Sequence, residues 1–504
     1  MNKHKTSSIF GPSSFLLILT LLVILICGLG VRLYDLKDPP LDYAATRQLR
    51  SALIARGIYY KHNHTVPEWK REMAIHLSNL SMLEPPINEA IVAGTYLIVG
   101  GEHLWIARIY SAFFWVLGGV ILFLLAKEMV STDGAIISLT FYLFSPFGMI
   151  VSRSFQPDLL MTTAIIFSWW TFYHWNRTST RKWAVLTGLS TGLALLVKST
   201  SVFFLFGGMT LGVLSEKKLK NVIQEAQTWV VVILSALPAV LYNLYGMLIQ
   251  DELQTQFQGL FYPQLWSSFS FYASWLSKLS KVLGFELILL MGLLGIFFVK
   301  SRKDRTMLTG IWLGYLLFGF IFSYHFITHS YYHLPTTPLL AISLGALAEY
   351  LFQWIRKFKL ENIVRVSLLM IIIVSVALGY YMVMKDDYRH EPDWYQTVAG
   401  YVGDESKVIA LTQDYGNRIR YYGWINPRIW HGTEDMERAA IQGSTPKPFT
   451  ERFSDYTAGY DYFLVTRLKE LKRQEKLYNE LYNNYTIYKE GGGFVIFDLN
   501  QPRQ

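Results

Sequence analysis

Four short stretches of the sequence place carboxylates, guanidiniums and phenols next to long apolar runs. They are LKDPPLDYAATRQLRSALIARGIYY (36–60), MLEPPINEA (82–90), SRSFQPDLL (152–160) and HFITHSYYHLPTTP (325–338). The first contains Asp42 ahead of Arg47, Arg50 and Arg56, and the third contains Asp158. If these residues meet, they could carry acid–base chemistry on a phosphorylated substrate.

The chemistry that this set favours is an inverting sugar transfer. A carboxylate near the water boundary takes the proton from an acceptor hydroxyl as that hydroxyl attacks the anomeric carbon. Arginines, assisted by a tyrosine, bind the departing phosphate and neutralise its growing charge. If the leaving group is a lipid phosphate, these residues must lie at headgroup depth in one outward-facing cavity.

Each of these residues also has a simpler structural explanation. Asp42 and Asp158 closely follow prolines, and an aspartate at such a position can cap a helix. Arg47 and Arg50 could bind lipid headgroups, as basic residues at a membrane interface commonly do. Glu84, which stands before Pro-Pro, could belong to a turn.

The fourth stretch contains three histidines, His325, His329 and His333, which are spaced by four residues. On a regular helix this spacing would bring the rings to one face, where they could hold a metal ion. Pro335 and the tyrosine pair before it argue against such a helix. A metal at this stretch is therefore an alternative to the main interpretation.

The composition places these stretches in a membrane protein. Hydrophobic residues make up 52% of the 504 residues and charged residues 16%, and the mean hydropathy is +0.26. Soluble domains carry about 25% charged residues, so the charges here are confined to short loops. The net charge of +9 then reflects loops that fix membrane topology rather than binding of nucleic acid. The single cysteine, Cys27, excludes an internal disulfide and a cysteine-based metal site.

Apolar runs of membrane-spanning length predict about eleven transmembrane helices. They cover residues 13–31, 105–126, 134–151, 159–175, 183–197, 201–215, 229–249, 283–299, 307–324, 334–352 and 364–384. The fifth and sixth are short, and we expect them to form a bent pair. The first run is too long for a signal peptide and lacks a cleavage site after it, so we expect a retained helix.

The distribution of basic residues fixes the expected orientation. The predicted inner segments contain seventeen lysines and arginines, and the short outer loops contain four. This bias places the N-terminus in the cytoplasm and the C-terminus on the outer, periplasmic side of the cell (inner) membrane. If the apolar stretch 87–100 crossed the membrane, all later loops would change sides and the basic loops would lie outside. We therefore expect an interfacial helix there.

Two regions outside the membrane are expected. Residues 33–104 form a long first outer loop with juxtamembrane helices, which belongs to a transmembrane catalytic domain of residues 1–384. Residues 385–504 form a small α/β domain, with strands at 407–412, 460–466 and 493–499. A helix at 467–485 is expected to present Leu468, Leu471, Tyr478, Leu481 and Tyr485 along one side.

Five stretches, taken together and in this order, resemble the GT-C glycosyltransferases. They are LDYAATRQLRSALIARGIYY, EPPINEAIVAGTYLIVGGEHLWIARIYSAFFWVLGG, SPFGMIVSRSFQPDLLM, LTGLSTGLALLVKST and YYHLPTTP. The branch that they resemble is that of the protein O-mannosyltransferases and the lipid A aminoarabinose transferase. The resemblance implies a GT-C fold, a polyprenyl-phosphate sugar donor and contact with membrane lipids.

The resemblance also implies roles for individual residues. It assigns catalysis to Asp42 and Asp158, and in some relatives the acid at the position of Glu84 helps to hold a divalent metal. The expected phosphate-binding residues are Arg47, Arg50, Lys198, Tyr331, Tyr332 and His333. Two positions depart from the pattern, because Tyr43 follows Asp42 where many relatives have a second acid, and Pro85 follows Glu84 where some have a basic residue.

We therefore expect an inverting hexosyl- or pentosyltransferase that moves a sugar from a polyprenyl-phosphate donor to a hydroxyl acceptor at the outer membrane face. The acceptor could be a glycolipid, a polysaccharide or a protein. An oligosaccharyltransferase or polysaccharide ligase of the same fold is the nearest alternative. A transporter or flippase of lipid-linked sugar would be expected to show inverted repeats and midplane charges, and a sugar-lipid sensor would need no catalytic acid.

Overall fold

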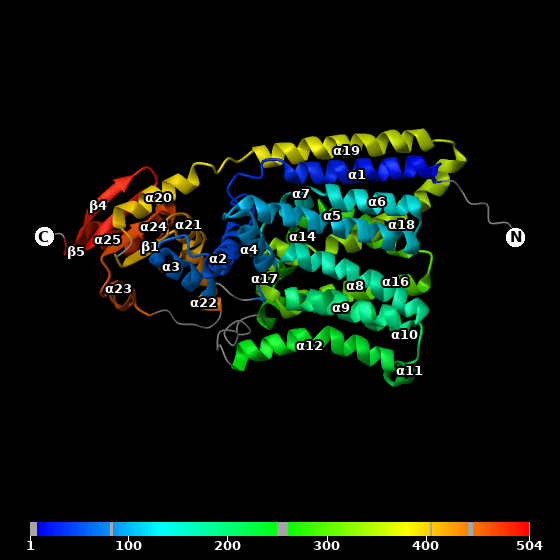
Figure 1. Ribbon diagram of the computed structural model, residues 1–504, viewed down its shortest axis with the longest axis horizontal. Helices are drawn as coiled ribbons and strands as arrows, with labels where there is room; N and C mark the ends of the chain where they lie inside the picture. Colours follow the sequence, from blue (N-terminus) through cyan, green and yellow to red (C-terminus); the bar gives the residue numbers. More distant parts are fainter. Residues whose placement is uncertain (1–7, 81–83, 249–260, 404–405, 442–446, 503–504) are drawn as a thin grey trace. The chain divides into compact units, whose positions relative to one another are not determined.

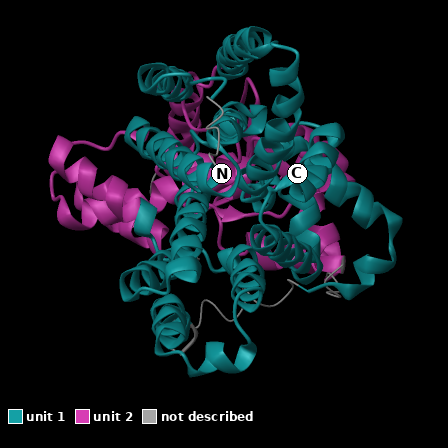
Figure 2. Cartoon of the chain, turned by 90° about the vertical axis from the view of Figure 1, so that its right-hand side faces the viewer, with its two compact units in different colours: residues 1–36, 83–88, 105–386 teal, residues 37–82, 89–104, 387–504 magenta. Residues whose placement is uncertain are grey.

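Long apolar helices dominate the computed structural model of this chain, which describes residues 8–80, 84–248, 261–403, 406–441 and 447–502. The chain divides into two compact units (Figure 2). Unit 1 consists of residues 1–36, 83–88 and 105–386, and unit 2 of residues 37–82, 89–104 and 387–504. Unit 2 thus combines most of the first loop with the C-terminal part of the chain.

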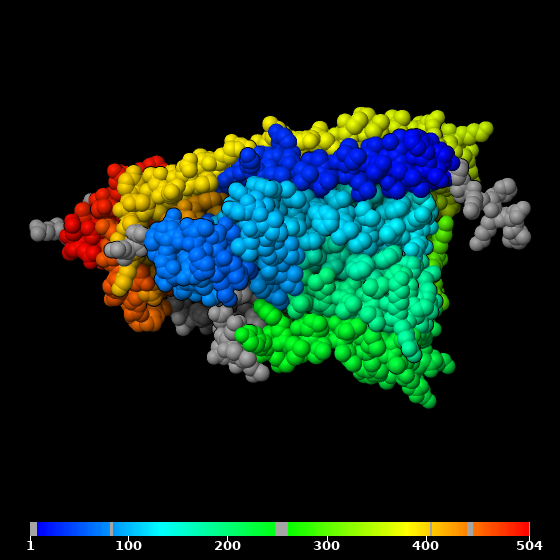
Figure 3. Space-filling view, viewed as in Figure 1, coloured from blue at the N-terminus to red at the C-terminus, as the bar shows by residue number. Residues whose placement is uncertain are grey.

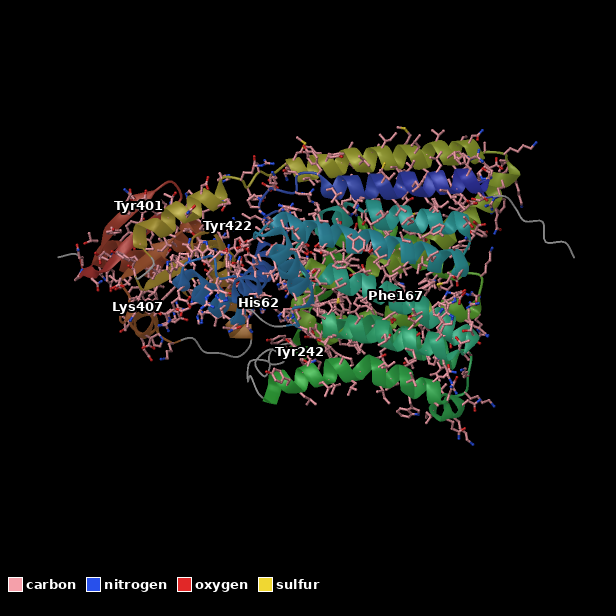
Figure 4. The ribbon with its side chains drawn as sticks, viewed as in Figure 1. His62, Phe167, Tyr242, Tyr401, Lys407 and Tyr422 are labelled. Atoms are coloured by element: carbon pink, nitrogen blue, oxygen red, sulfur yellow. The ribbon has the colours of Figure 1, made fainter. Side chains whose placement is uncertain are left out.

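Unit 1 is a bundle of helices (Figure 1). Its helices are α1 (Ser14–Leu33), α5 (Leu104–Met129), α6 (Thr132–Phe144), α7 (Pro146–Val151), α8 (Asp158–Thr178), α9 (Arg181–Val197), α10 (Val202–Leu214), α11 (Leu219–Gln224), α12 (Ala226–Leu248), α14 (Phe269–Leu283), α15 (Glu286–Gly295), α16 (Arg302–Ile321), α17 (Ser323–Thr328), α18 (Thr336–Lys357) and α19 (Glu361–Met384). Short 3₁₀ helices lie at η1 (Ser199–Ser201), η2 (Pro263–Ser267), η3 (Ile296–Phe298) and η4 (Ser330–His333). Side chains occupy the spaces between these helices (Figure 4).

Each of the predicted apolar runs is largely helical, and the run at 134–151 is interrupted at Ser145, where α6 gives way to α7. Within the described residues, five helices are long and apolar enough to cross a membrane, or six if one bent pair counts as a span. That pair is α14 with the helix that follows it, bent by 82°. The sequence did not predict α14, which carries Lys278 and Lys281 and is amphipathic rather than uniformly apolar.

The outer helices of the bundle present apolar side chains to their surroundings. Among the candidate spans, 17% of the apolar window is buried in α1, α12 and α19, compared with 50% in α5 and 56% in α18. The helices α1 and α19 lie side by side on one face of the bundle (Figures 1 and 3). Exposed leucine, isoleucine and valine along whole helices fit a lipid environment, because water would penalise that surface.

Ion pairs connect several of the charged loops of unit 1 with one another. Arg177 Nη2 lies 2.6 Å from Asp304 Oδ1, and Arg356 Nη2 lies 2.6 Å from Asp133 Oδ2. Lys303 pairs with Glu216 in the same way. These contacts join loops that the distribution of basic residues assigned to one membrane side. The assignment of that side to the cytoplasm remains a prediction.

Two helices of unit 1 approach each other closely through glycine. A Cβ atom added at Gly310 of α16 would lie 2.3 Å from the carbonyl oxygen of Gly207 in α10. The reverse substitution at Gly207 would bring its Cβ to 2.2 Å from the Gly310 carbonyl oxygen. Small residues let helix backbones pack tightly in a membrane, where van der Waals contact drives helix association.

Unit 2 takes its first helices from the long loop. They are α2 (Ala45–His62), α3 (Glu68–Asn79) and α4 (Ile87–Val99), of which residues 89–99 belong to this unit. With 13 residues, α4 is about 20 Å long and cannot by itself cross a hydrocarbon core of about 30 Å. Leu97, Ile98 and Val99 are exposed at its end, as expected of a helix that lies at an interface.

The C-terminal part of unit 2 is built on a five-stranded sheet with the order β2-β1-β3-β5-β4. The strands are β1 (Val408–Leu411), β2 (Arg428–Ile429), β3 (Tyr462–Val465), β4 (Tyr485–Gly491) and β5 (Phe494–Pro502), and β1 is parallel to β2 and β3. The helices are α20 (Glu391–Val402), α21 (Asn417–Tyr422), α22 (Thr433–Ile441), α23 (Phe449–Thr457), α24 (Leu468–Arg473) and α25 (Glu475–Asn484), with the 3₁₀ turn η5 (Gln413–Gly416). The small α/β domain and three of its strands are as predicted.

The single helix predicted at 467–485 is wrong, because the chain breaks into α24 and α25 at Gln474. The side chain of Gln474 accepts a hydrogen bond from Trp430 Nε1 at 2.9 Å and donates one to the His431 carbonyl at 3.1 Å. These contacts hold Gln474 at φ −93° and ψ 70°, which is not helical. The break still lets Leu471 and Leu481 pack into the core.

Candidate functional site

A buried ion pair lies at one end of the unit 1 bundle. Asp158 is the first residue of α8, where the helix dipole favours a negative charge. Lys198 follows the last residue of α9, and its Nζ atom lies 2.7 Å from Asp158 Oδ1. Both residues are almost fully buried. The short α9 and the turn after it therefore bring a lysine to the start of a neighbouring helix.

Two tyrosines of η4 complete the surroundings of this pair. The Lys198 Nζ atom lies 4.9 Å from the ring centroid of Tyr331 and 5.0 Å from that of Tyr332. Burying a charge is costly, and carboxylate and aromatic faces offset that cost by electrostatic attraction. The structure thus brings together four of the residues singled out in the sequence, and their side chains form a buried ion pair flanked by two aromatic rings.

His333 occupies a different environment from these tyrosines. Its Nδ1 atom lies 2.8 Å from the Tyr315 hydroxyl, and its Nε2 atom lies 2.8 Å from the Phe326 carbonyl oxygen. Because a carbonyl can only accept, Nε2 carries the proton and Nδ1 accepts from Tyr315. Trp275 Nε1 donates to the same tyrosine at 2.7 Å. Burial lowers the pKa of His333 to about 4, so its ring is neutral at physiological pH.

This network argues against a metal bound by the three histidines. Both ring nitrogens of His333 are used within unit 1, which leaves no lone pair for a metal. Within the described ranges, no group of three or more His, Cys, Asp or Glu side chains is arranged to hold a metal ion. Glu84, half-buried just before α4, therefore belongs to no such group among the described residues.

Two buried arginines support the same end of unit 1. Arg153 donates to the carbonyl oxygens of Tyr34 and of Asp35, the latter at 3.0 Å. Arg32 Nε lies 2.6 Å from Ser152 Oγ. Both guanidiniums thereby tie the exit of α1 to the segment before α8, and the sequence pattern gave Arg153 no such role.

Asp42 does not cap the helix that follows it. The N-cap of α2 is Ala44, which has a left-handed backbone (φ 45°) and makes no side-chain cap. The Oδ1 atom of Asp42 instead accepts from Gln48 Nε2 at 3.1 Å and from the Tyr43 amide at 3.0 Å. The carboxylate is partly exposed. The capping alternative is thus wrong for Asp42, and for Asp158 as well, since Pro157 precedes α8 as its N-cap.

The three arginines of α2 differ in their surroundings. Arg47 and Arg50 are half-buried and lie three residues apart, which places them on one face of the helix. Arg56 is buried, with Nε 3.0 Å from Glu102 Oε1 and Nη1 2.6 Å from the Tyr421 carbonyl oxygen. Its guanidinium carbon also lies 3.7 Å from the Tyr421 ring centroid and 4.1 Å from that of Trp424. Arg56 therefore joins parts of unit 2 to one another.

Part of the chain is similar in sequence to a known protein family. The family described as dolichyl-phosphate-mannose-protein mannosyltransferase matches residues 83–245. A comparison with curated protein sequences finds no match. The match therefore covers the segment that contains α4, α5, both acids Glu84 and Asp158, and Lys198.

Solved structures match nearly the whole chain. ArnT from Cupriavidus metallidurans bound to undecaprenyl phosphate matches with a TM-score of 0.60 and 13% sequence identity, over 96% of this chain and 97% of ArnT. The oligosaccharyltransferase of Archaeoglobus fulgidus tethered with an acceptor peptide matches with a TM-score of 0.55 and 12% identity, over 96% of this chain and 74% of the other.

The chain is thus a membrane-embedded protein of the GT-C glycosyltransferase fold. Residues 83–245 match the mannosyltransferase family model, and nearly the whole chain shares the fold of ArnT. This confirms the fold class that was expected from the five stretches of sequence.

Proposed function

We propose that this protein is an inverting glycosyltransferase that moves a single sugar from a polyprenyl-phosphate carrier to a hydroxyl acceptor at the outer membrane face. The observation that carries the proposal is the match over 96% of this chain and 97% of ArnT, in a structure that holds undecaprenyl phosphate. The Lys198 ammonium supports it, because a phosphate leaving group needs positive charge at the point of departure.

The proposed reaction is a single displacement. The acceptor hydroxyl oxygen attacks the anomeric carbon, the bond from that carbon to the phosphate oxygen breaks, and the configuration inverts. The hydroxyl proton passes to the Asp42 carboxylate. The polyprenyl phosphate departs with the bonding electrons. Asp42 suits the role of base because its carboxylate is partly exposed and already accepts two hydrogen bonds, which hold its orientation.

The phosphate would be bound by cations and phenols. Lys198 is the proposed contact, with Tyr331 and Tyr332 beside it. Asp158 assists by holding the Lys198 ammonium in place. His333 acts by positioning η4 through its two hydrogen bonds rather than by contacting phosphate.

A mostly apolar cavity among the helices of unit 1 offers space for part of the lipid chain. It has a volume of about 360 Å³ and is lined by residues of α8, α9, α10, α11 and α12.

The test is a transfer assay in lipid nanodiscs with a series of undecaprenyl-phosphate sugars and a membrane fraction that contains acceptors. We expect release of undecaprenyl phosphate from one donor, measured by mass spectrometry, together with a product that is heavier by one sugar. Failure to release carrier from every donor in the series, by protein that is folded and inserted, would refute the proposal.

Transfer of a preassembled glycan is a second candidate, favoured by the match to the Archaeoglobus oligosaccharyltransferase. That match covers 74% of the other chain, compared with 97% of ArnT, so the single-sugar reaction is the better supported of the two. The product mass separates them, because a preassembled glycan would add several sugars in one step.

A further inference from the structure

A polar cleft lies within unit 2 at the carboxyl edge of its parallel strands. It has a volume of about 320 Å³. Its walls include residues just past the ends of three strands, among them Thr412 after β1, Trp430 after β2 and Arg467, two residues after β3. Thr46 of α2 also lines it. The residues assigned above to catalysis and phosphate binding are not among those that line this cleft.

The strand order explains why a cleft forms at this edge. Strand β1 lies between β2 and β3, and all three are parallel. The connection from β1 to β2 therefore runs to one side of β1, and β3 is added on the other side. A crevice opens between these connections at the carboxyl ends of the strands. Open α/β sheets bind ligands at such switch points.

The turn after β1 is held in an unfavourable backbone conformation. Asp414 and Tyr415 have φ values of 51° and 55°, which cost side chains other than glycine about 1–2 kcal/mol each. The Asp414 carboxylate accepts from Thr46 Oγ1 at 2.8 Å and from Arg418 Nε at 2.5 Å, and Tyr415 donates its hydroxyl to Asp435 Oδ1 at 2.8 Å. These contacts maintain the strain, which presents the tyrosine ring with 49% of its surface exposed.

The lining favours a saccharide over other small molecules. Carboxylates of Asp414, Glu434 and Asp435 can accept from several hydroxyls at once, and Arg418 and Arg467 can donate to ring or hydroxyl oxygens. A half-exposed aromatic ring offers a flat apolar face for the C–H side of a sugar ring. The acidic side chains repel phosphate, and the turn TQDYG lacks the glycine-rich pattern that holds a dinucleotide.

We infer that this cleft is a binding site for a neutral saccharide, with Tyr415 as its stacking platform and Asp414, Asp435 and Arg418 as its polar contacts. The saccharide belongs to the acceptor, so the acceptor is a glycan. This second statement rests on the proposed function, whereas the binding itself does not.

The first experiment uses the full-length protein in nanodiscs on an array of defined neutral, phosphorylated and sulfated oligosaccharides. We expect binding to a subset of the neutral ones, weakened at least tenfold by Tyr415→Ala and by Asp435→Asn. Tyr488→Ala is the matched control, because Tyr488 of β4 has the same exposed fraction of 49%, and it should bind as the unmodified protein does. Absence of binding to the whole array, or equal loss in the control, would overturn the inference.

A second variant separates folding from binding. Tyr415→Gly relieves the left-handed backbone at this position, so it should raise the unfolding temperature while saccharide binding is lost. If Tyr415→Gly is more stable and still binds the saccharide, the saccharide does not stack on the Tyr415 ring.

The transfer assay distinguishes the acceptor from the donor as the source of the saccharide. We expect Tyr415→Ala to raise KM for the acceptor fraction about tenfold and to leave KM for the lipid donor unchanged. A rise in the donor KM alone would instead assign the cleft to the donor sugar and contradict the acceptor assignment. If neutral saccharides bind but no carrier is released from any donor, saccharide binding by the cleft is supported and the proposed transfer reaction is refuted.

Discussion

The Nζ atom of Lys198 lies 2.7 Å from Oδ1 of Asp158, forty residues earlier in the chain, inside the end of a helical bundle. Both residues are nearly inaccessible to solvent, and two tyrosine rings flank the ammonium. A buried pair of this kind stabilises a fold weakly, and buried charges gather at functional sites. It is the feature of unit 1 that the proposed phosphate binding requires.

Breaking this pair on one side should destabilise the protein more than removing both charges. We expect Lys198→Met to cost about 3 kcal/mol, because it leaves the Asp158 carboxylate buried without its cation. The double variant Lys198→Met with Asp158→Leu should recover much of that loss. Thermal unfolding in detergent measures both. Equal stability of the two variants would contradict the ion pair.

The same variants should separate stability from donor binding. Undecaprenyl phosphate should bind at least tenfold more weakly to the stable double variant, because the cation that faces the phosphate is absent. Lys217→Met, which removes a lysine from a loop ion pair elsewhere in unit 1, should leave this affinity unchanged. Unaltered affinity in the double variant would remove Lys198 from the phosphate site.

His333 should make stability depend on pH in acid. Burial lowers its pKa to about 4, compared with about 6.5 for an exposed histidine. Between these two pH values the unfolded chain binds more protons than the folded chain. The contribution of His333 to the free energy of unfolding is therefore fully present above pH 6.5, and roughly 3 kcal/mol of it is lost as the pH decreases from 6.5 to 4.

The variant His333→Gln should lack this part of the pH dependence when unfolding temperatures are measured from pH 7 to 4.5. His431→Gln changes an exposed histidine and should follow the unmodified protein. Parallel curves for the unmodified protein and His333→Gln would show that this histidine titrates normally.

Arg56 should be needed for the stability of unit 2 rather than for chemistry. Arg56→Lys keeps the charge but loses the planar contacts with Tyr421 and Trp424, at a cost of about 2 kcal/mol. Arg71→Lys, which alters an exposed pair with Glu68, should leave stability nearly unchanged. Hydrogen exchange of residues 417–424 would report the difference, and unchanged protection in Arg56→Lys would refute it.

The contact between α10 and α16 should not tolerate a methyl group. Gly310→Ala would place Cβ 2.3 Å from the Gly207 carbonyl oxygen, so the helices must move apart at a cost of about 1–3 kcal/mol. A Cβ at Gly94 of α4 meets no heavy atom within 4 Å, and Gly94→Ala should be neutral or slightly stabilising. Equal unfolding temperatures for the two variants would mean that α10 and α16 are not in close contact.

Hydropathy and the alternation of charge were sufficient to predict the helices of the bundle, because each apolar run is set by its own composition. They could not reveal α14, whose two lysines lower its hydropathy and whose amphipathic surface suits an interface. The three strands with continuous apolar residues were predicted. The two-residue β2 and the mostly exposed β4 were not, because neither carries a buried apolar pattern.

Site residues were harder to assign, because their roles depend on partners distant in sequence. Arg56 resembles Arg47 and Arg50 in the sequence, and its structural role appears only with Tyr421, 365 residues later. His333 looked like a phosphate ligand beside two tyrosines, yet its ring lies in an apolar pocket with Tyr315 and Phe326. The unusual backbone of Asp414 and Tyr415 leaves no mark in the sequence, since neither residue is glycine.

The most direct test of the account is the rate of transfer by Asp42→Asn, measured as undecaprenyl phosphate released in nanodiscs with donor and acceptor saturating. We predict that kcat falls at least a hundredfold, because asparagine cannot take the acceptor proton, while unfolding temperature and donor affinity stay unchanged. Asp393→Asn, which removes an exposed carboxylate of α20, should retain full activity. Full activity in Asp42→Asn would contradict the proposed base.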